Sequence, residues 1–202
     1  MKRAIAVAAI SLALHVAARA DGIDLVNKFG TISISNAGIT STGSQLRQFK
    51  ALDTGHALGS VMFSTGALLT GSILTGGTFS SIGSMFEVIG KGNGGQPKGV
   101  IFDGAFVGPI LWTLVSQNGP SLIFQLNGQI SGQLYNGTTV SGTTTQMFHT
   151  TPAQLANGIL HLTGGNTHLN TVPEPGTLGL LATGLLAIGQ IARRKLRTRN
   201  VA

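Results

Sequence analysis

Apolar and polar side chains alternate along much of the middle of the chain, a pattern that is typical of β-strands with one buried face. Residues 31–35 alternate at period two, and the clearest region runs over residues 99–135. We expect four strands in this second region because apolar residues recur on one face of each. Those residues are Val100, Ile101, Phe102 and Phe106, then Ile110, Trp112 and Leu114, then Leu122, Phe124 and Leu126, and finally Ile130 and Leu134.

Glycine, proline and asparagine separate these apolar runs. We expect breaks at residues 107–109, 117–120 and 127–128. The Asn-Gly pair at 127–128 is a strong signal for a hairpin turn because both residues tolerate positive φ. Strands of about six residues at roughly ten-residue spacing predict an all-β fold, a single antiparallel domain built like a sandwich or a barrel.

The rest of the central region predicts short strands, a loop and one short helix. Thr-Gly repeats over residues 64–76 predict two or three short strands, and residues 90–97 have the composition of a loop. Residues 151–158 predict one or two helical turns, since they begin Thr-Pro and end in Gly. The threonine-rich residues 138–145 predict an edge strand, either an ordinary one or one that pairs with another copy of the chain.

The N-terminus has the pattern of a secretory signal peptide. A basic start precedes an apolar stretch over residues 4–18, and Ala18 and Ala20 fit the small-x-small rule for cleavage. We expect a signal peptide over residues 1–20, a mature chain beginning at Asp21, and signal peptidase with the general secretion machinery as partners. An uncleaved N-terminal anchor is the alternative.

A second apolar stretch, residues 176–192, lies near the C-terminus. At about 1.5 Å per residue it is close to the lower limit for crossing a bilayer. The residues before it are Val172, Pro173, Glu174 and Pro175, whose prolines favour an extended segment. Five cations follow, which places that end in the cytoplasm; they are Arg193, Arg194, Lys195, Arg197 and Arg199. We expect a transmembrane helix, and a buried helix of a soluble domain is the alternative.

The order of motif, apolar stretch and basic end resembles the PEP-CTERM sorting signal of Gram-negative bacteria. The resemblance covers about thirty of the 202 residues. It implies transient anchoring in the inner membrane with the body in the periplasm. It further implies recognition of Pro173, Glu174 and Pro175 by an exosortase-like membrane transpeptidase, and release to the cell surface or an exopolysaccharide matrix.

The strongly basic balance of the chain belongs to its two ends. The net charge is +7 and the pI about 10.6. Residues 1–20 and 193–199 hold eight of the thirteen lysines and arginines, whereas residues 21–171 contain five cations and five acids. A neutral body argues against nucleic acid as a partner. The absence of cysteine excludes disulfides and thiol catalysis.

Candidates for catalysis are few in the body. Its histidines do not form an H-x-H or H-E-x-x-H motif, so we expect no metal and no cofactor; they are His56, His149, His161 and His168. Asp53 and His56 with a serine would make a triad only by chance, since no nucleophile-elbow motif is present. Glu87 and Asp103 are the best carboxylate pair for glycoside hydrolysis, although each is also an ordinary solvent-facing strand residue.

These observations favour an exported, non-enzymatic cell-surface or matrix protein. Its expected parts are a signal peptide over residues 1–20, an all-β domain over 21–163, a polar linker over 164–171 and a sorting segment over 172–202. The first alternative is a secreted polysaccharide-binding module, and the second is a carboxylate-dependent glycoside hydrolase. The chain has one Trp and one Tyr as potential sugar platforms, and Trp112 shares a face with apolar neighbours and is therefore expected in the core.

Overall fold

The computed structural model describes residues 22–50, 52–53, 56–93, 95–171 and 184–185, with only the backbone at 52 and 53. The chain divides into two compact units, residues 1–171 and residues 172–202. No helix of the described part is long and apolar enough to span a bilayer.

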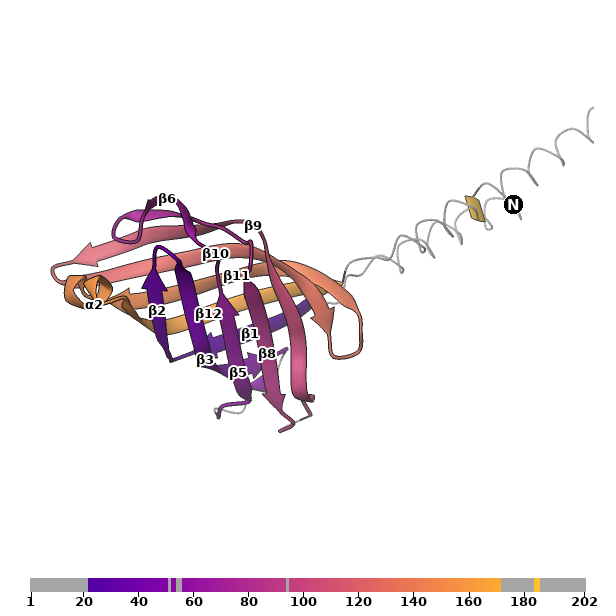
Figure 1. Cartoon of the computed structure of the whole chain (residues 1–202). Helices are drawn as coiled ribbons and strands as arrows, with labels where there is room; N and C mark the ends of the chain where they lie inside the picture. The colour runs from indigo at the N-terminus through magenta and orange to yellow at the C-terminus, as the bar shows by residue number, and fades with distance from the viewer. Residues whose placement is uncertain (1–21, 51, 54–55, 94, 172–183, 186–202) are drawn as a thin grey trace, which may run out of the picture. The chain divides into compact units, whose positions relative to one another are not determined.

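Eight antiparallel strands close into a barrel, and each pairs with the next along the chain (Figure 1). Pairing of the last strand with the first completes the ring. The strands are β1 (Gly22–Lys28), β3 (Gly38–Phe49), β5 (Gly59–Ser64), β8 (Met85–Lys91), β9 (Lys98–Asn118), β10 (Ser121–Leu134), β11 (Thr139–Thr150) and β12 (Ile159–Thr171). The expected all-β, antiparallel, barrel-like fold is therefore confirmed.

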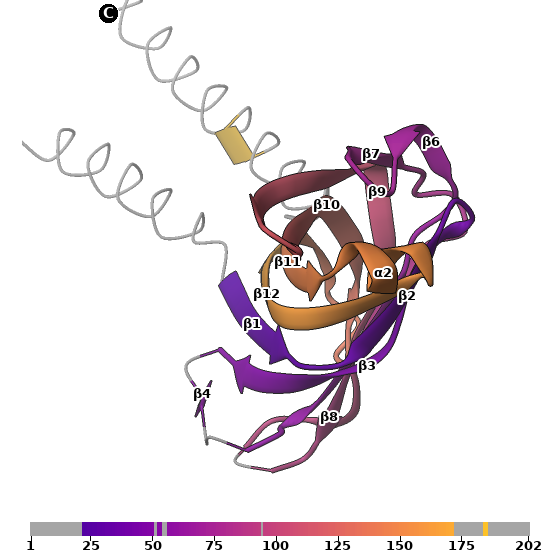
Figure 2. The same cartoon turned by 90° about the vertical axis from the view of Figure 1, so that its left-hand side faces the viewer.

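Four short strands and a helix decorate the barrel. β2 (Thr31–Ser35) pairs with β3 and β12, and β4 (Leu52–Asp53) pairs with β3. β6 (Leu68–Ser72) and β7 (Gly76–Phe79) form a hairpin beside β9 (Figure 2). The predicted helix is confirmed as α2 (Pro152–Ala156), with Thr151 as N-cap and a capping box completed by Gln154.

Large apolar side chains fill the barrel, as is usual for eight strands. Trp112 is 1% exposed and stacks on Phe124, with ring centroids 4.5 Å apart. The expectation that Trp112 belongs to the core is therefore confirmed. Leu155 of α2 is also fully buried and joins the same cluster, so the helix packs on the barrel through one leucine.

A cluster of uncharged polar side chains is buried in this core. Asn27 and Gln146 bond through both amides, Nδ2 to Oε1 at 3.0 Å and Nε2 to Oδ1 at 3.3 Å. Asn27 also donates to Ser44 Oγ at 2.8 Å, and Gln146 donates to Thr144 Oγ1 at 2.8 Å. Gly165 lies opposite both Asn27 and Gln146, and the absence of a side chain there lets the two amides meet.

Two of the three predicted breaks are wrong. β9 continues through residues 107–109, where Gly108 at φ 73° bends the strand and the register against β10 shifts. β10 continues through residues 127–128, because Gly128 serves packing instead of turning: a Cβ there would lie 2.5 Å from the Phe106 ring. Only the break predicted at residues 117–120 forms a turn, with Gly119 at φ 57° between β9 and β10.

Two further expectations are corrected by β11 and β12. Residues 139–145 form no edge, because β11 pairs with β10 on one side and β12 on the other. The polar linker expected at residues 164–171 is the second half of β12, and all β12 partners of β1 lie within it. Its small polar residues face the buried amide cluster or the solvent, which explains why its composition looked like that of a linker.

Candidate functional site

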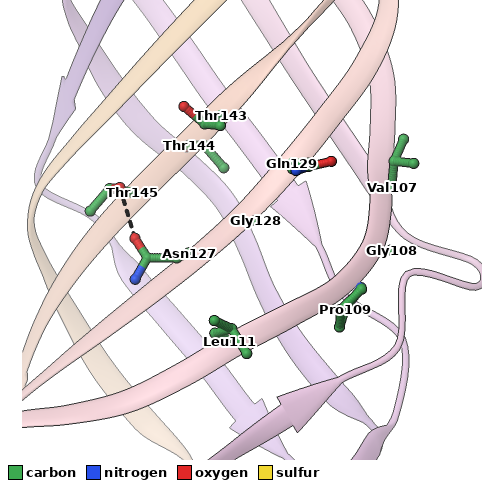
Figure 3. Close-up of a pocket in the computed structure, with 10 residues that line it drawn as sticks. All are labelled: Val107, Gly108, Pro109, Leu111, Asn127, Gly128, Gln129, Thr143, Thr144 and Thr145. Carbon is green, nitrogen blue, oxygen red and sulfur yellow. Dashed lines mark hydrogen bonds between the residues drawn. The ribbon is translucent and has the colours of Figure 1, made fainter.

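A hollow of about 470 Å³ lies on the outer face of the barrel where β9 bends beside β10 and β11 (Figure 3). Its apolar wall comes from the bend in β9, where Val107 and Leu111 are each 49% exposed and Pro109 is also exposed. These residues alternate with the buried Phe106 and Ile110, which face the core. The bend therefore turns apolar side chains toward solvent beside the hollow.

Amide and hydroxyl groups of β10 and β11 form the opposite wall. Thr145 Oγ1 donates to Asn127 Oδ1 at 2.8 Å (Figure 3). Gln125 Nε2 donates to the same oxygen at 3.2 Å. These two bonds fix the amide of Asn127. Within the described part of the chain, Asn127 Nδ2 and the side chains of Gln129 and Thr143 form no hydrogen bond. They are available to a ligand.

The lining of the hollow contains no titratable side chain. It offers no general base to activate its threonine hydroxyls and no charge, so the arrangement suits binding of a neutral molecule. A ligand that fits it presents apolar surface to β9 and hydrogen-bonding groups to β10 and β11.

The strand registers continue the polar wall across the barrel. Gln129 lies opposite Thr143, Thr143 opposite His168, and His168 opposite Asp24. His168 Nδ1 lies 2.6 Å from Asp24 Oδ1, and both side chains are about half exposed. A band of amide, hydroxyl, imidazole and carboxylate groups thus runs from the hollow to β1.

The carboxylates proposed for glycoside hydrolysis are brought together. Glu87 in β8 lies directly opposite Asp103 in β9. Directly opposed residues have Cβ atoms about 4.5–5.5 Å apart, which suits the short carboxylate spacing of a retaining hydrolase. Neither residue lines the hollow or a smaller one of about 160 Å³ beside β2.

The histidines form separate local contacts. His149 and His161 are opposed across β11 and β12, but their Nε2 atoms contact Ser121 Oγ at 2.9 Å and Gln154 Nε2 at 3.3 Å. No group of three metal-ligating side chains occurs among the described residues. His56 is exposed, and the side chain of Asp53, its suggested triad partner, lies outside the described residues.

Sequence reasoning missed the hollow and the Ser121–His149 contact. Both join residues from different strands, and neither leaves a motif in the sequence. A usable signal for the hollow was the run of amides alternating with core residues in β10, namely Gln125, Asn127 and Gln129.

The targeting residues predicted from the sequence lie outside the described residues. They are Ala18, Ala20 and Asp21 at the cleavage site, Val172, Pro173, Glu174 and Pro175 of the motif, and the basic residues Arg193, Arg194, Lys195, Arg197 and Arg199. Only Gly184 and Leu185 of the predicted transmembrane segment are described.

Comparison with known proteins gives one match. Residues 171–197 match the family model of the PEP-CTERM protein-sorting motif, in agreement with the resemblance found in the sequence. No curated protein and no solved structure matches the chain. The motif implies export, transient association with the membrane and processing by an exosortase-like membrane enzyme.

Proposed function

We propose that this carrier of a PEP-CTERM motif is a non-enzymatic protein of the cell surface or of an exopolysaccharide matrix. Its body folds in the periplasm while the C-terminal segment holds it in the inner membrane, and an exosortase-like transpeptidase then releases it. The observation that carries the proposal is the motif match at residues 171–197, which begins at the last residue of the last barrel strand. The absence of titratable groups from the hollow supports a binding or structural role.

Cell fractionation with intact-mass measurement tests the sorting part. We expect the native protein outside the inner membrane, beginning at Asp21 and ending near Glu174. A Pro173→Ala/Glu174→Ala/Pro175→Ala variant should keep its tail and stay in the inner membrane. A control with alanine at the exposed residues Ser116, Gln117 and Asn118 should be released normally. Retention of the tail by the native protein would contradict the proposal.

Binding of a neutral polysaccharide is a second candidate function, favoured by the hollow. Sugars present apolar C–H faces edged with hydroxyls, which match the apolar wall of β9 and the unpartnered amides of β10. The band from Gln129 to Asp24 crosses four strands, which at about 4.8 Å spacing gives roughly 14 Å of further contact for an extended chain. Weak binding summed over many such contacts suits a polymer ligand.

Affinity electrophoresis in gels containing dextran or galactomannan tests this second function. Gln129→Ala should lower the retardation several-fold, because Gln129 forms no bond within the described barrel and its loss removes only a ligand contact. Gln133→Ala is the matched control, since Gln133 is exposed on the same strand outside the hollow. Equal retardation of the two variants would remove the hollow as the binding site.

A further inference from the structure

We propose that, while the C-terminal segment is intact, the end of the barrel where β12 finishes docks on anionic phospholipid headgroups of the bilayer. This inference rests on the proposed function, because it requires the apolar stretch to lie in the membrane. It adds a second contact between the body and the bilayer, made by the folded barrel itself.

The short sequence between β12 and the apolar stretch restricts how far the barrel can move from the membrane. β12 extends to Thr171, so four residues separate it from the apolar stretch that begins at residue 176. Four residues add at most about 14 Å even when fully extended. The barrel end that carries Thr171 must therefore remain close to the bilayer surface.

The strand registers show which segments share this end. Thr171 pairs with the start of β11. Farther round the barrel, Lys91 at the end of β8 lies opposite Lys98 at the start of β9. The backbone N–H of Lys50 donates to the Asp24 carbonyl near the start of β1 at 2.7 Å. These segments lie on the right and lower sides of the barrel in Figure 1.

Exposed cations gather at this end. Lys50, Lys91 and Lys98 are all exposed, and they are three of the five cations of residues 21–171. Like charges placed directly opposite each other destabilise a strand pair, as with Lys91 and Lys98. Neither lysine of the opposed pair forms an ion pair with an acidic side chain among the described residues. An anionic surface supplies the missing counter-charge.

The neighbouring charges are arranged to favour this contact. Glu87 lies four residues from Lys91 along β8 and Asp103 lies five residues from Lys98 along β9, about 13 Å away from the end. Of the other acids here, Asp24 is paired with His168, whereas Asp21 and the side chain of Asp53 lie outside the described residues. At the opposite end, the turn at residues 119–120 and the segment 151–158 carry no charged residue.

Apolar and aromatic groups accompany the lysines. Val100 is 44% exposed, two residues from Lys98, and Tyr135 is 60% exposed, with its backbone N–H donating to the Ile101 carbonyl at 2.9 Å. Tyrosine and lysine side chains are characteristic of the membrane interface, where an apolar body and a polar tip are both accommodated. The end therefore combines charge with groups that enter the headgroup layer.

Single-cysteine labelling tests the inference cleanly because the chain has no cysteine. Asn93→Cys places a fluorophore in the exposed loop between β8 and β9, and Asn118→Cys places it at the opposite end. The full-length protein is reconstituted in phosphatidylcholine vesicles with and without phosphatidylglycerol, and nitroxide-headgroup lipids serve as quenchers. We expect several-fold stronger quenching at position 93 than at 118 when phosphatidylglycerol is present.

Charge dependence supplies the controls. Quenching at position 93 should fall toward that at 118 in high salt, without phosphatidylglycerol, or in a Lys50→Gln/Lys91→Gln/Lys98→Gln variant. Lys28→Gln, an exposed cation outside this end, should leave it unchanged.

The outcomes separate failure of the inference from failure of the proposed function. Flotation with vesicles of phosphatidylcholine alone reports on the C-terminal segment, because these vesicles offer no anionic headgroup to the lysines, and its absence would overturn both. Flotation with equal quenching at the two positions would overturn only the docking inference. Quenching at position 93 that does not change with salt or with lipid charge would also overturn the docking inference. So would lysine-dependent binding of an acidic polysaccharide by a protein that shows no lysine-dependent quenching by lipid.

Discussion

Gly165 shows how a single missing side chain determines the interior of the barrel. It lies between Asn27 and Gln146, whose amides bond to each other over it. Buried amides are tolerated because they are hydrogen-bonded, and these two also bond to Ser44 and Thr144. Any side chain at position 165 must displace the pair.

Gly165→Ala should therefore destabilise the protein by about 2–3 kcal/mol, because the added methyl overpacks the core and separates bonded amides. Urea unfolding followed by circular dichroism measures the loss. Gly164→Ala is the control, since a Cβ there meets nothing within 4 Å. Equal stability of the two variants would show that the amide pair can move aside without cost.

At the scale of strands, β8 and β9 carry two like-charged pairs on one face. Glu87 opposes Asp103, and Lys91 opposes Lys98. Exchanging one member of the acidic pair for a neutral isostere removes a repulsion without changing the shape of the side chain. The same exchange also tests the hydrolase alternative, which requires both carboxylates.

Glu87→Gln should raise the free energy of unfolding by about 0.2–1 kcal/mol at low salt, and the gain should shrink as salt screens the pair. Asp24→Asn, which removes an attraction to His168, should give no such gain. A hydrolase would instead lose its turnover of polysaccharide in Glu87→Gln, and that result would contradict a non-enzymatic function.

Local patterns predicted which residues face the core but not where strands end. The alternation that placed Phe124 and Leu126 inside, and the Thr-Pro start of α2, depend on neighbouring residues and were visible in the sequence. Gly108 and Gly128 were misread as turn residues because their roles, a bend and a close contact with Phe106, depend on partners in other strands. The alternating amides of β10 indicated one polar wall of the hollow, but its full shape depends on partners in the same way, since its walls come from three strands.

For the whole molecule, closure of the barrel depends on residues that resemble a linker. Every β12 partner of β1 lies within residues 165–170. Their loss would leave one side of β1 and most of one side of β11 unpaired and would open the ring. The boundary of the folded body therefore lies at Thr171 and not at residue 163.

A chain ending at Thr171 should unfold in one cooperative thermal transition, whereas a chain ending at residue 163 should show none. Circular dichroism during heating distinguishes the two, and both forms should begin at Asp21. Similar cooperative transitions in both chains would mean that residues 164–171 are dispensable for the fold.

The pairing of β12 with β1 also sets the order of events during synthesis. β1 can pair with β12 only after β12 has been synthesised, so the ring cannot close until residue 171 has left the ribosome. Contacts between segments so distant in sequence form slowly. We expect the nascent chain to remain without a closed barrel during translation. A secretion channel then has time to translocate it as an extended polypeptide before the barrel closes.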